Sequence, residues 1–193
     1  MGYLLEILYD VLFQPAAAMS QIAGRRLVGK SLVVFIVSIL LPSWAMWFGL
    51  KSTSLGYAVN GIIVLHVMGS LLLWFFGAAL LHLIAEFMGG RGTAMGLFAA
   101  LGFAQFPRIF MVPLWVVAAV LPEGIRPVVM GITALVILFW VLALHIAALK
   151  GAYAIGGVKA TLVLIMPFLA LTLFVIAMVT FVSVQFMQWP QWS

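Results

Sequence analysis

Long apolar runs recur along this sequence, and they limit its fold more than any other feature. A helix of about 20 apolar residues is long enough to cross the hydrocarbon core of a bilayer. Of the 193 residues, 67% are hydrophobic and 7% are charged, whereas about 25% of a soluble domain is charged. The sequence therefore predicts an all-α, polytopic membrane protein that forms a single domain, residues 1–193.

Five transmembrane helices are predicted, separated by short polar or glycine-rich turns. The turns lie where basic residues, prolines and glycines interrupt the apolar runs. Pro107 and Pro113 fall inside the third span, where proline removes a helical hydrogen bond and should kink the helix. The predicted spans cover residues 31–50, 58–88, 93–121, 127–149 and 160–184.

An N-terminal amphipathic helix, residues 3–19, is predicted ahead of the first span. Its apolar face carries Leu4, Ile7, Leu8, Val11 and Leu12, and its polar face Glu6, Asp10 and Gln14. We expect this helix to lie in the membrane interface. Packing against the end of the helix bundle is the alternative.

Basic and aromatic residues predict the orientation of the spans. A cytoplasmic N-terminus leaves only Lys51 and Arg126 in outer loops, as the positive-inside rule favours. The basic residues then placed inside are Arg25, Arg26, Lys30, Arg91, Lys150 and Lys159. The aromatic residues expected at the opposite interface are Trp44, Trp47, Tyr57, Trp115, Trp189 and Trp192. Both patterns place the C-terminus on the side opposite the N-terminus.

The net charge of +5 does not indicate a nucleic-acid partner, because the basic residues are scattered between apolar runs. The chain also contains no cysteine, which excludes disulfides and thiolate chemistry.

Three segments carry a resemblance to a known family: LFQPAAAM (12–19), HLIAEFMGGRGTAMGLFAALGFAQFP (82–107) and LFWVLALHIAALKGAYAIGGVKA (138–160). With the spacing of the spans, they resemble the bacterial members of the Yip family, the Ypt/Rab-interacting five-span membrane proteins. The resemblance implies five helices, a cytoplasmic N-terminus and a place in the bacterial inner membrane. Eukaryotic relatives bind prenylated small GTPases in vesicle traffic. We do not expect that activity here, because this sequence lacks their long cytoplasmic N-terminal region.

One polar cluster is predicted near the cytoplasmic side of the membrane. His82 and Glu86 are spaced i, i+4 and therefore share a helix face. His145 is expected at a comparable depth on the fourth span. These side chains could hold a metal or relay a proton, but no fourth ligand is evident. We therefore expect the histidines to bridge helices and Glu86 to reach headgroup water, with no metal or cofactor.

Arg108 is the most unusual residue, because it falls inside the third span with His66 expected at a similar depth. A charge in hydrocarbon is expensive and normally faces protein or water. We expect Arg108 to extend to the outer headgroups or to donate to carbonyls that Pro107 and Pro113 free. The alternative is that Arg108 and His66 line a hydrated cavity that favours anions.

Small residues recur every four positions and predict close helix packing. The third-span stripe is Gly92, Gly96, Ala100 and Ala104, and the fourth-span stripe is Ala143, Ala147 and Gly151. The seams could lie within one chain or between copies, and we expect the neighbouring Leu97 to face lipid. Residues 89–92, Gly-Gly-Arg-Gly, lack the Gly-Lys-Ser/Thr ending of a phosphate loop. We expect them to end a helix in the left-handed conformation and reverse the chain.

The leading hypothesis for function is a non-enzymatic membrane scaffold or accessory protein that binds membrane lipids and other membrane proteins, or a second copy of itself. The alternative is a small transporter or channel that uses His66, Arg108 and the group of His82, Glu86 and His145. An intramembrane metalloenzyme ranks third, and no catalytic residue is assigned.

Overall fold

The structure, a computed structural model, describes residues 2–51, 54 and 56–188, and the regular elements in these ranges are all helical. In chain order these are α1 (Gly2–Phe13), α2 (Pro15–Gly24), α3 (Val28–Lys51), α4 (Val59–Phe87), α5 (Ala94–Phe103), the 3-10 helix η1 (Phe106–Phe110), α6 (Met111–Ala119), α7 (Arg126–Tyr153) and α8 (Gly157–Gln188). Trp189 and Trp192, expected at the outer interface, lie outside the described residues.

Within the described residues, five helical segments are long and apolar enough to cross a membrane: Val28–Gly49, Val59–Phe87, Ala94–Ala119, Arg126–Tyr153 and Gly157–Gln185. They confirm the predicted all-α fold and its five apolar helices. The third segment is interrupted, because the chain leaves α-helical geometry after α5, passes through η1 and becomes α-helical again in α6. Pro107 lies inside this interruption, in the first turn of η1, where its missing N–H removes a helical hydrogen bond.

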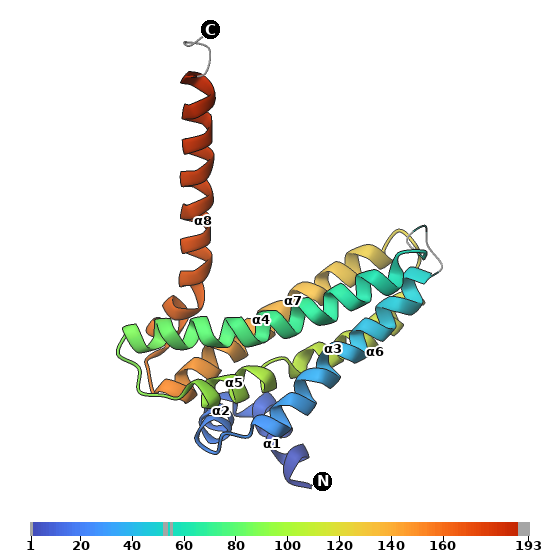
Figure 1. Cartoon of the computed structure of the whole chain (residues 1–193). Coiled ribbons are helices and arrows are strands. Elements are labelled where there is room, and N and C mark those ends of the chain that lie inside the picture. Colours follow the sequence, from blue (N-terminus) through green and yellow to red (C-terminus); the bar gives the residue numbers. More distant parts are fainter. Residues whose placement is uncertain (1, 52–53, 55, 189–193) are drawn as a thin grey trace.

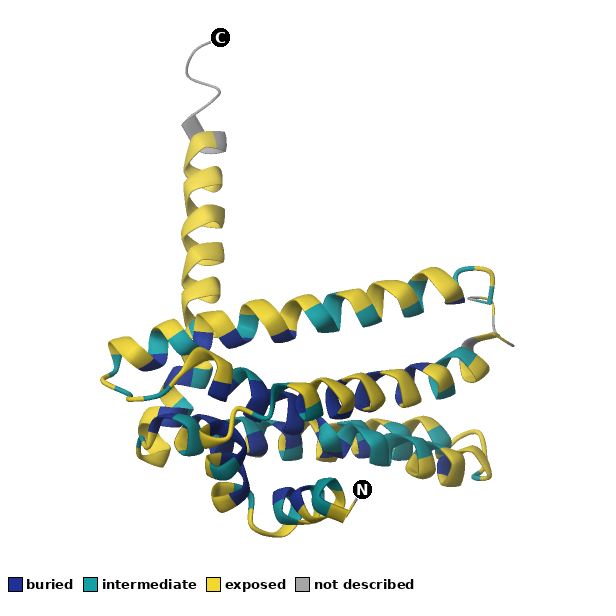
Figure 2. Cartoon of the chain, turned by 60° about the horizontal axis from the view of Figure 1, so that its bottom comes forward, coloured by how far each residue is buried: buried dark blue, intermediate teal, exposed yellow. Residues whose placement is uncertain are grey.

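The short helix α2 lies at the packed end of the molecule, below α5 in the view of Figure 1. Although its ten residues are too few to span a bilayer, it packs between α5 and α7. Its Ala18, Met19, Ile22 and Ala23 are buried. Figure 2 shows that buried residues gather where these three helices meet.

Two glycines allow α5 and α7 to approach the backbone of α2. A Cβ added to Gly96 on α5 would lie 2.9 Å from the carbonyl oxygen of Ala23. One added to Gly151 on α7 would lie 2.5 Å from the backbone nitrogen of Ser20 and 2.8 Å from the carbonyl carbon of Met19. Backbone atoms cannot rotate away as a flexible side chain can, so both positions require glycine. The fold thus depends on contacts between helix backbones.

The prediction of one amphipathic helix over residues 3–19 is wrong. The helix ends at Phe13, and a second helix starts at Pro15, which occupies the first helical position that proline favours. Nor is α1 clearly amphipathic, since Ile7 and Val11 are buried while Leu5, Tyr9 and Phe13 are at least 60% exposed. Its buried face packs next to α2, the alternative that the sequence left open.

Aromatic stacking joins α3, α4 and α5. The ring of Trp74 lies between those of Phe35 and Phe98, with centroids 4.0 Å away on each side. The indole N–H of Trp74 donates to the carbonyl of Phe98 at 3.2 Å. Ser31 adds a hydrogen bond from its hydroxyl to the carbonyl of Ala99, 2.8 Å away. These contacts fix α5 against two spanning helices while satisfying the polar groups involved.

The last helix, α8, stands apart from the bundle and runs in a different direction from α3, α4 and α7 (Figure 1). Only its start is packed, where Ala160 and Val163 are fully buried. All side chains of residues 168–185 are exposed, as the uniform colouring of this helix in Figure 2 shows. Most of a spanning helix is therefore available to lipid or to a partner.

Two Gly→Ala substitutions on α7 should have opposite effects on stability. Gly151→Ala should lower the free energy of unfolding by about 1–3 kcal/mol, because the new methyl group overpacks the contact with α2. Gly131→Ala should leave stability unchanged or raise it by up to about 1 kcal/mol, because nothing lies within 4 Å of its added Cβ and alanine favours helix. Thermal unfolding in detergent measures both. Equal midpoints would contradict the contact between α2 and α7.

Candidate functional site

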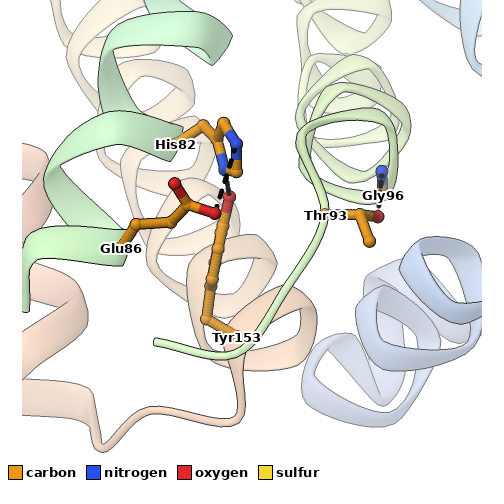
Figure 3. A network of polar contacts seen from close by, with 5 residues as sticks. All are labelled: His82, Glu86, Thr93, Gly96 and Tyr153. Atoms are coloured by element: carbon orange, nitrogen blue, oxygen red, sulfur yellow. Dashed lines mark hydrogen bonds and ion pairs between the residues drawn. The ribbon is translucent and has the colours of Figure 1, made fainter. Parts of the chain in front are cut away.

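His82 on α4 is hydrogen-bonded to Tyr153, at the end of α7 (Figure 3). The Nδ1 atom of His82 and the hydroxyl of Tyr153 lie 2.5 Å apart. Glu86, one turn further along α4, places its Oε1 atom 3.6 Å from Nε2 of His82. The Glu86 side chain is 54% exposed, so this longer contact contributes little to stability. His82 therefore bridges α4 and α7, as the sequence led us to expect of the histidines.

The Gly-Gly-Arg-Gly turn closes around the ring of Tyr153. Gly89 has a φ of +81°, which confirms that this glycine ends α4 in the left-handed conformation. A Cβ on Gly90 would lie 2.9 Å from Cδ1 of Tyr153, and one on Gly92 would meet the same ring and the carbonyl oxygen of Ala152. The backbone N–H of Arg91 donates to the carbonyl of Tyr153 at 3.4 Å. The absence of side chains at Gly90 and Gly92 thus allows the turn to pack closely against the ring of Tyr153.

Thr93 begins the next helix directly after this turn. Its side-chain hydroxyl accepts a hydrogen bond from the backbone N–H of Gly96 at 3.1 Å, the geometry of a helix N-cap (Figure 3). One short segment therefore ends α4, packs against α7 and starts α5.

His145 does not join the pair of His82 and Glu86. Its Nδ1 atom lies 2.7 Å from the carbonyl oxygen of Val141, and its Nε2 atom lies 3.2 Å from Nε2 of Gln105. Within the described part of the chain, no group of three or more His, Cys, Asp or Glu side chains is placed to hold a metal ion. The predicted cluster is thus divided between two sites, and Tyr153 takes the place expected for His145 beside His82.

The hydrogen bonds of His145 determine which atom of the Gln105 side-chain amide faces it. The carbonyl of Val141 can only accept, so Nδ1 of His145 carries the hydrogen and Nε2 of the neutral ring accepts. The side-chain amide of Gln105 therefore donates to that nitrogen. Its oxygen, Oε1, is then an acceptor, and this atom is buried without a hydrogen-bond partner among the described residues. Gln105 is only 8% exposed, so the unpaired oxygen is a costly feature.

Arg108, which lies in η1, lines two adjoining cavities inside the bundle. The first has a volume of about 150 Å³ and is also lined by Gln105 and His145. The second has a volume of about 260 Å³ and is also lined by His66 of α4. The structure thus brings Arg108 and His66 to one cavity, as the alternative sequence hypothesis supposed. The Arg108 guanidinium makes no hydrogen bond or ion pair with any described residue, including the carbonyls near Pro107 and Pro113.

The predicted small-residue stripes are mostly packed inside this chain. Gly92 meets Tyr153, while Gly96 and Gly151 meet α2. The stripe members that are buried or nearly so are Ala100, Ala104 and Ala147. Ala143 is exposed and lies outside the seam. The expectation that Leu97 faces lipid is wrong, because its side chain is fully buried in the core around α2.

Sequence reasoning missed two important polar residues, Tyr153 and Gln105. Tyr153 ends α7 just before a left-handed residue, Ala154, with a φ of 53°. Gln105 is an uncharged polar side chain within an apolar span, next to a proline-containing segment. An intramembrane amide of this kind normally hydrogen-bonds across helices, a signal that could have suggested a partner on a neighbouring span.

Comparison with known proteins identifies a family. The family model described as "Yip1 domain" matches residues 9–179, most of the chain. No curated protein matches the sequence. No solved structure matches it either.

Two substitutions of Tyr153 should separate its hydroxyl from its ring. Tyr153→Phe should lower the free energy of unfolding by about 1 kcal/mol, the usual worth of one hydrogen bond. Tyr153→Ala should lower it by about 3–5 kcal/mol, because it also removes a ring packed on the glycine turn. Chemical or thermal unfolding in detergent measures the difference. If the two variants have the same free energy of unfolding, the glycine turn does not depend on the ring of Tyr153.

Proposed function

Because the chain belongs to the Yip1 domain family, we propose that it is a non-enzymatic membrane scaffold or accessory protein that binds other membrane proteins and lipids. Its five apolar helices make it an integral membrane protein. The observation that carries the proposal is the exposure of α8. In the most apolar 18-residue stretch of α8, 6% of the residues are buried, whereas 50% are buried in the corresponding stretch of the interrupted third span.

The exposed part of α8 is chemically suited to a partner helix in lipid. The hydroxyls of Thr172, Thr180 and Ser183 all donate to carbonyls of their own helix, so they need no outside hydrogen-bond partner. Ala170 and Ala177 are seven residues apart and therefore share a face. Small side chains permit close van der Waals contact, which drives helix association in membranes. The proposed partner is a spanning helix of another protein or of a second copy.

The orientation belongs to the same proposal. We place the N-terminus and residues 89–92 in the cytoplasm and the C-terminus on the opposite side of a bacterial inner membrane. The basic residues and the aromatic residues Trp44, Trp47 and Trp115 support this arrangement. Because α8 runs in a different direction from the other long helices (Figure 1), crossing the same flat bilayer requires it to turn at its start. Gly156 and Gly157 lie there.

A small transporter or channel remains the second candidate, and one observation favours it. The third span is interrupted beside two cavities that Arg108 lines. Transporters place binding sites at such interruptions in spanning helices. Ion flux through reconstituted protein distinguishes the candidates, since a scaffold supports none.

Photo-crosslinking from α8 tests the proposed scaffold. A photoreactive amino acid at Ala177 should give a protein adduct of defined mass in native membranes, because this face meets the partner helix. The same probe at Val179 should react with lipid, because two residues rotate a helix by about 200°. Mass spectrometry then separates a second copy from a different membrane protein. Lipid adducts alone at both positions would contradict a partner on this face.

Accessibility of introduced cysteines tests the orientation. An impermeant thiol reagent should label Gly124→Cys in intact cells and Arg91→Cys only after permeabilisation, because the third span separates these two turns. The native chain has no cysteine to interfere. Labelling of both positions from the same side would show that residues 94–119 do not cross the membrane.

A further inference from the structure

We propose that the interruption in the third span forms an intramembrane binding site for a small oxyanion that carries its own hydroxyl, of the hydrogenphosphate or hydrogencarbonate class. Arg108 supplies the positive charge. Gln105 supplies an acceptor for the hydroxyl of the anion. The site goes beyond the proposed scaffold, which needs only the outer surface of α8.

The charge of Arg108 calls for an anion because no carboxylate side chain of the described residues lines the cavities beside it. Its four carboxylate side chains belong to Glu6, Asp10, Glu86 and Glu123. Glu86 contacts His82, and none of the four is among the described residues that line the cavities beside Arg108. A guanidinium held among apolar helices without a carboxylate must find water or a bound anion. Its five N–H groups, arranged as a planar fork, suit the oxygens of an oxyanion.

Gln105 narrows the class of anion. Its Oε1 atom is a buried acceptor without a partner, and the residue lines the same cavity as Arg108. Chloride or a fully deprotonated anion has no hydrogen to donate to this oxygen. An oxyanion with a hydroxyl satisfies both groups, since its charged oxygens accept from Arg108 while its O–H donates to Gln105. His145 holds the amide in this orientation through the hydrogen bond between their Nε2 atoms.

The size of the site also limits the ligand. The cavity of about 150 Å³ is well above the roughly 10–15 Å³ that a cavity needs to hold one water. Such a space has room for a single phosphate or carbonate group. Arg108 also lines the second cavity, of about 260 Å³, together with His66 of α4.

The backbone of the third span also fits an intramembrane site, because its α-helix is interrupted beside the cavities. Non-helical backbone is tolerated at membrane depth only where protein buries it or where it lines a polar cavity. Here the chain departs from α-helical geometry at residues 104–105 and in the 3-10 helix η1, which lies against α3 and α7. Two serines of α3, Ser38 and Ser43, also line the second cavity, but each hydroxyl donates to its own helix. The groups without a partner among the described residues are therefore those of Gln105 and Arg108 at the first cavity, together with the buried indole N–H of Trp115 at the second.

Ligand-dependent unfolding of the full chain in nanodiscs of zwitterionic lipid tests the site. A ligand that binds only the folded protein raises its unfolding temperature. Inorganic phosphate and bicarbonate should raise that temperature, whereas chloride at equal ionic strength should raise it less. A separate sample with phosphatidic acid in the nanodisc distinguishes a lipid phosphomonoester from the free ion. Stabilisation by either phosphate source supports the site, and no effect of phosphate, bicarbonate or phosphatidic acid overturns it.

Three variants assign the effect to named residues. Arg108→Leu should bind radiolabelled phosphate about tenfold more weakly or worse, as loss of a charged hydrogen-bond partner implies. Gln105→Leu should lose the preference for phosphate over chloride. Arg91→Leu, which removes an exposed arginine from the turn after α4, should bind as the unchanged chain does. If Arg108→Leu does not fold, Arg108→Gln replaces it in the binding measurement. Unchanged phosphate binding in the Arg108 variant, or equal weakening in Arg91→Leu, would overturn the proposal.

Discussion

The contact of α2 with α5 and α7 is the constraint on which the remaining structure depends. In lipid, apolar side chains gain little by leaving their surroundings, so helix association relies on close packing and hydrogen bonds. Gly96 and Gly151 provide that packing by admitting the backbone of α2. The glycine turn around Tyr153 then ties α4 to the same end of the molecule. The long helices are more exposed at the end that lies away from α2, as Figure 2 shows.

The polar residues within the spans form two separate groups with different physical properties. The hydrogen bond between His82 and Tyr153 joins two helices and satisfies both side chains. The group formed by Gln105, His145 and Arg108 instead leaves one buried oxygen and one cation unpaired within the described chain. Unpaired groups of this kind destabilise a membrane protein. Such groups are often retained for binding, which is why the oxyanion site is assigned to the second group.

Features set by local chemistry could be predicted from the sequence, and features set by tertiary contacts could not. Apolar run lengths identified the five long helices, Gly89 predicted the left-handed end of α4, and Pro107 predicted the interruption of the third span. The burial of α2 was missed because Pro15–Gly24 is short and rich in alanine, and because its packing depends on glycines far away in the sequence. His145 was assigned to the wrong group because depth along a helix does not specify which way a side chain points. Leu97 was misplaced for the same reason.

Hydrogen exchange of the α2 backbone tests most directly whether this short helix is part of the core. In detergent, where water reaches helix ends, the amides of buried elements exchange only when those elements open. We expect residues 18–24 to exchange as slowly as residues 97–103 of α5, and both segments to lose protection together as denaturant is added. Rapid exchange of α2 while α5 and α7 stay protected would contradict it, since α2 would then be a surface helix that the bundle does not need.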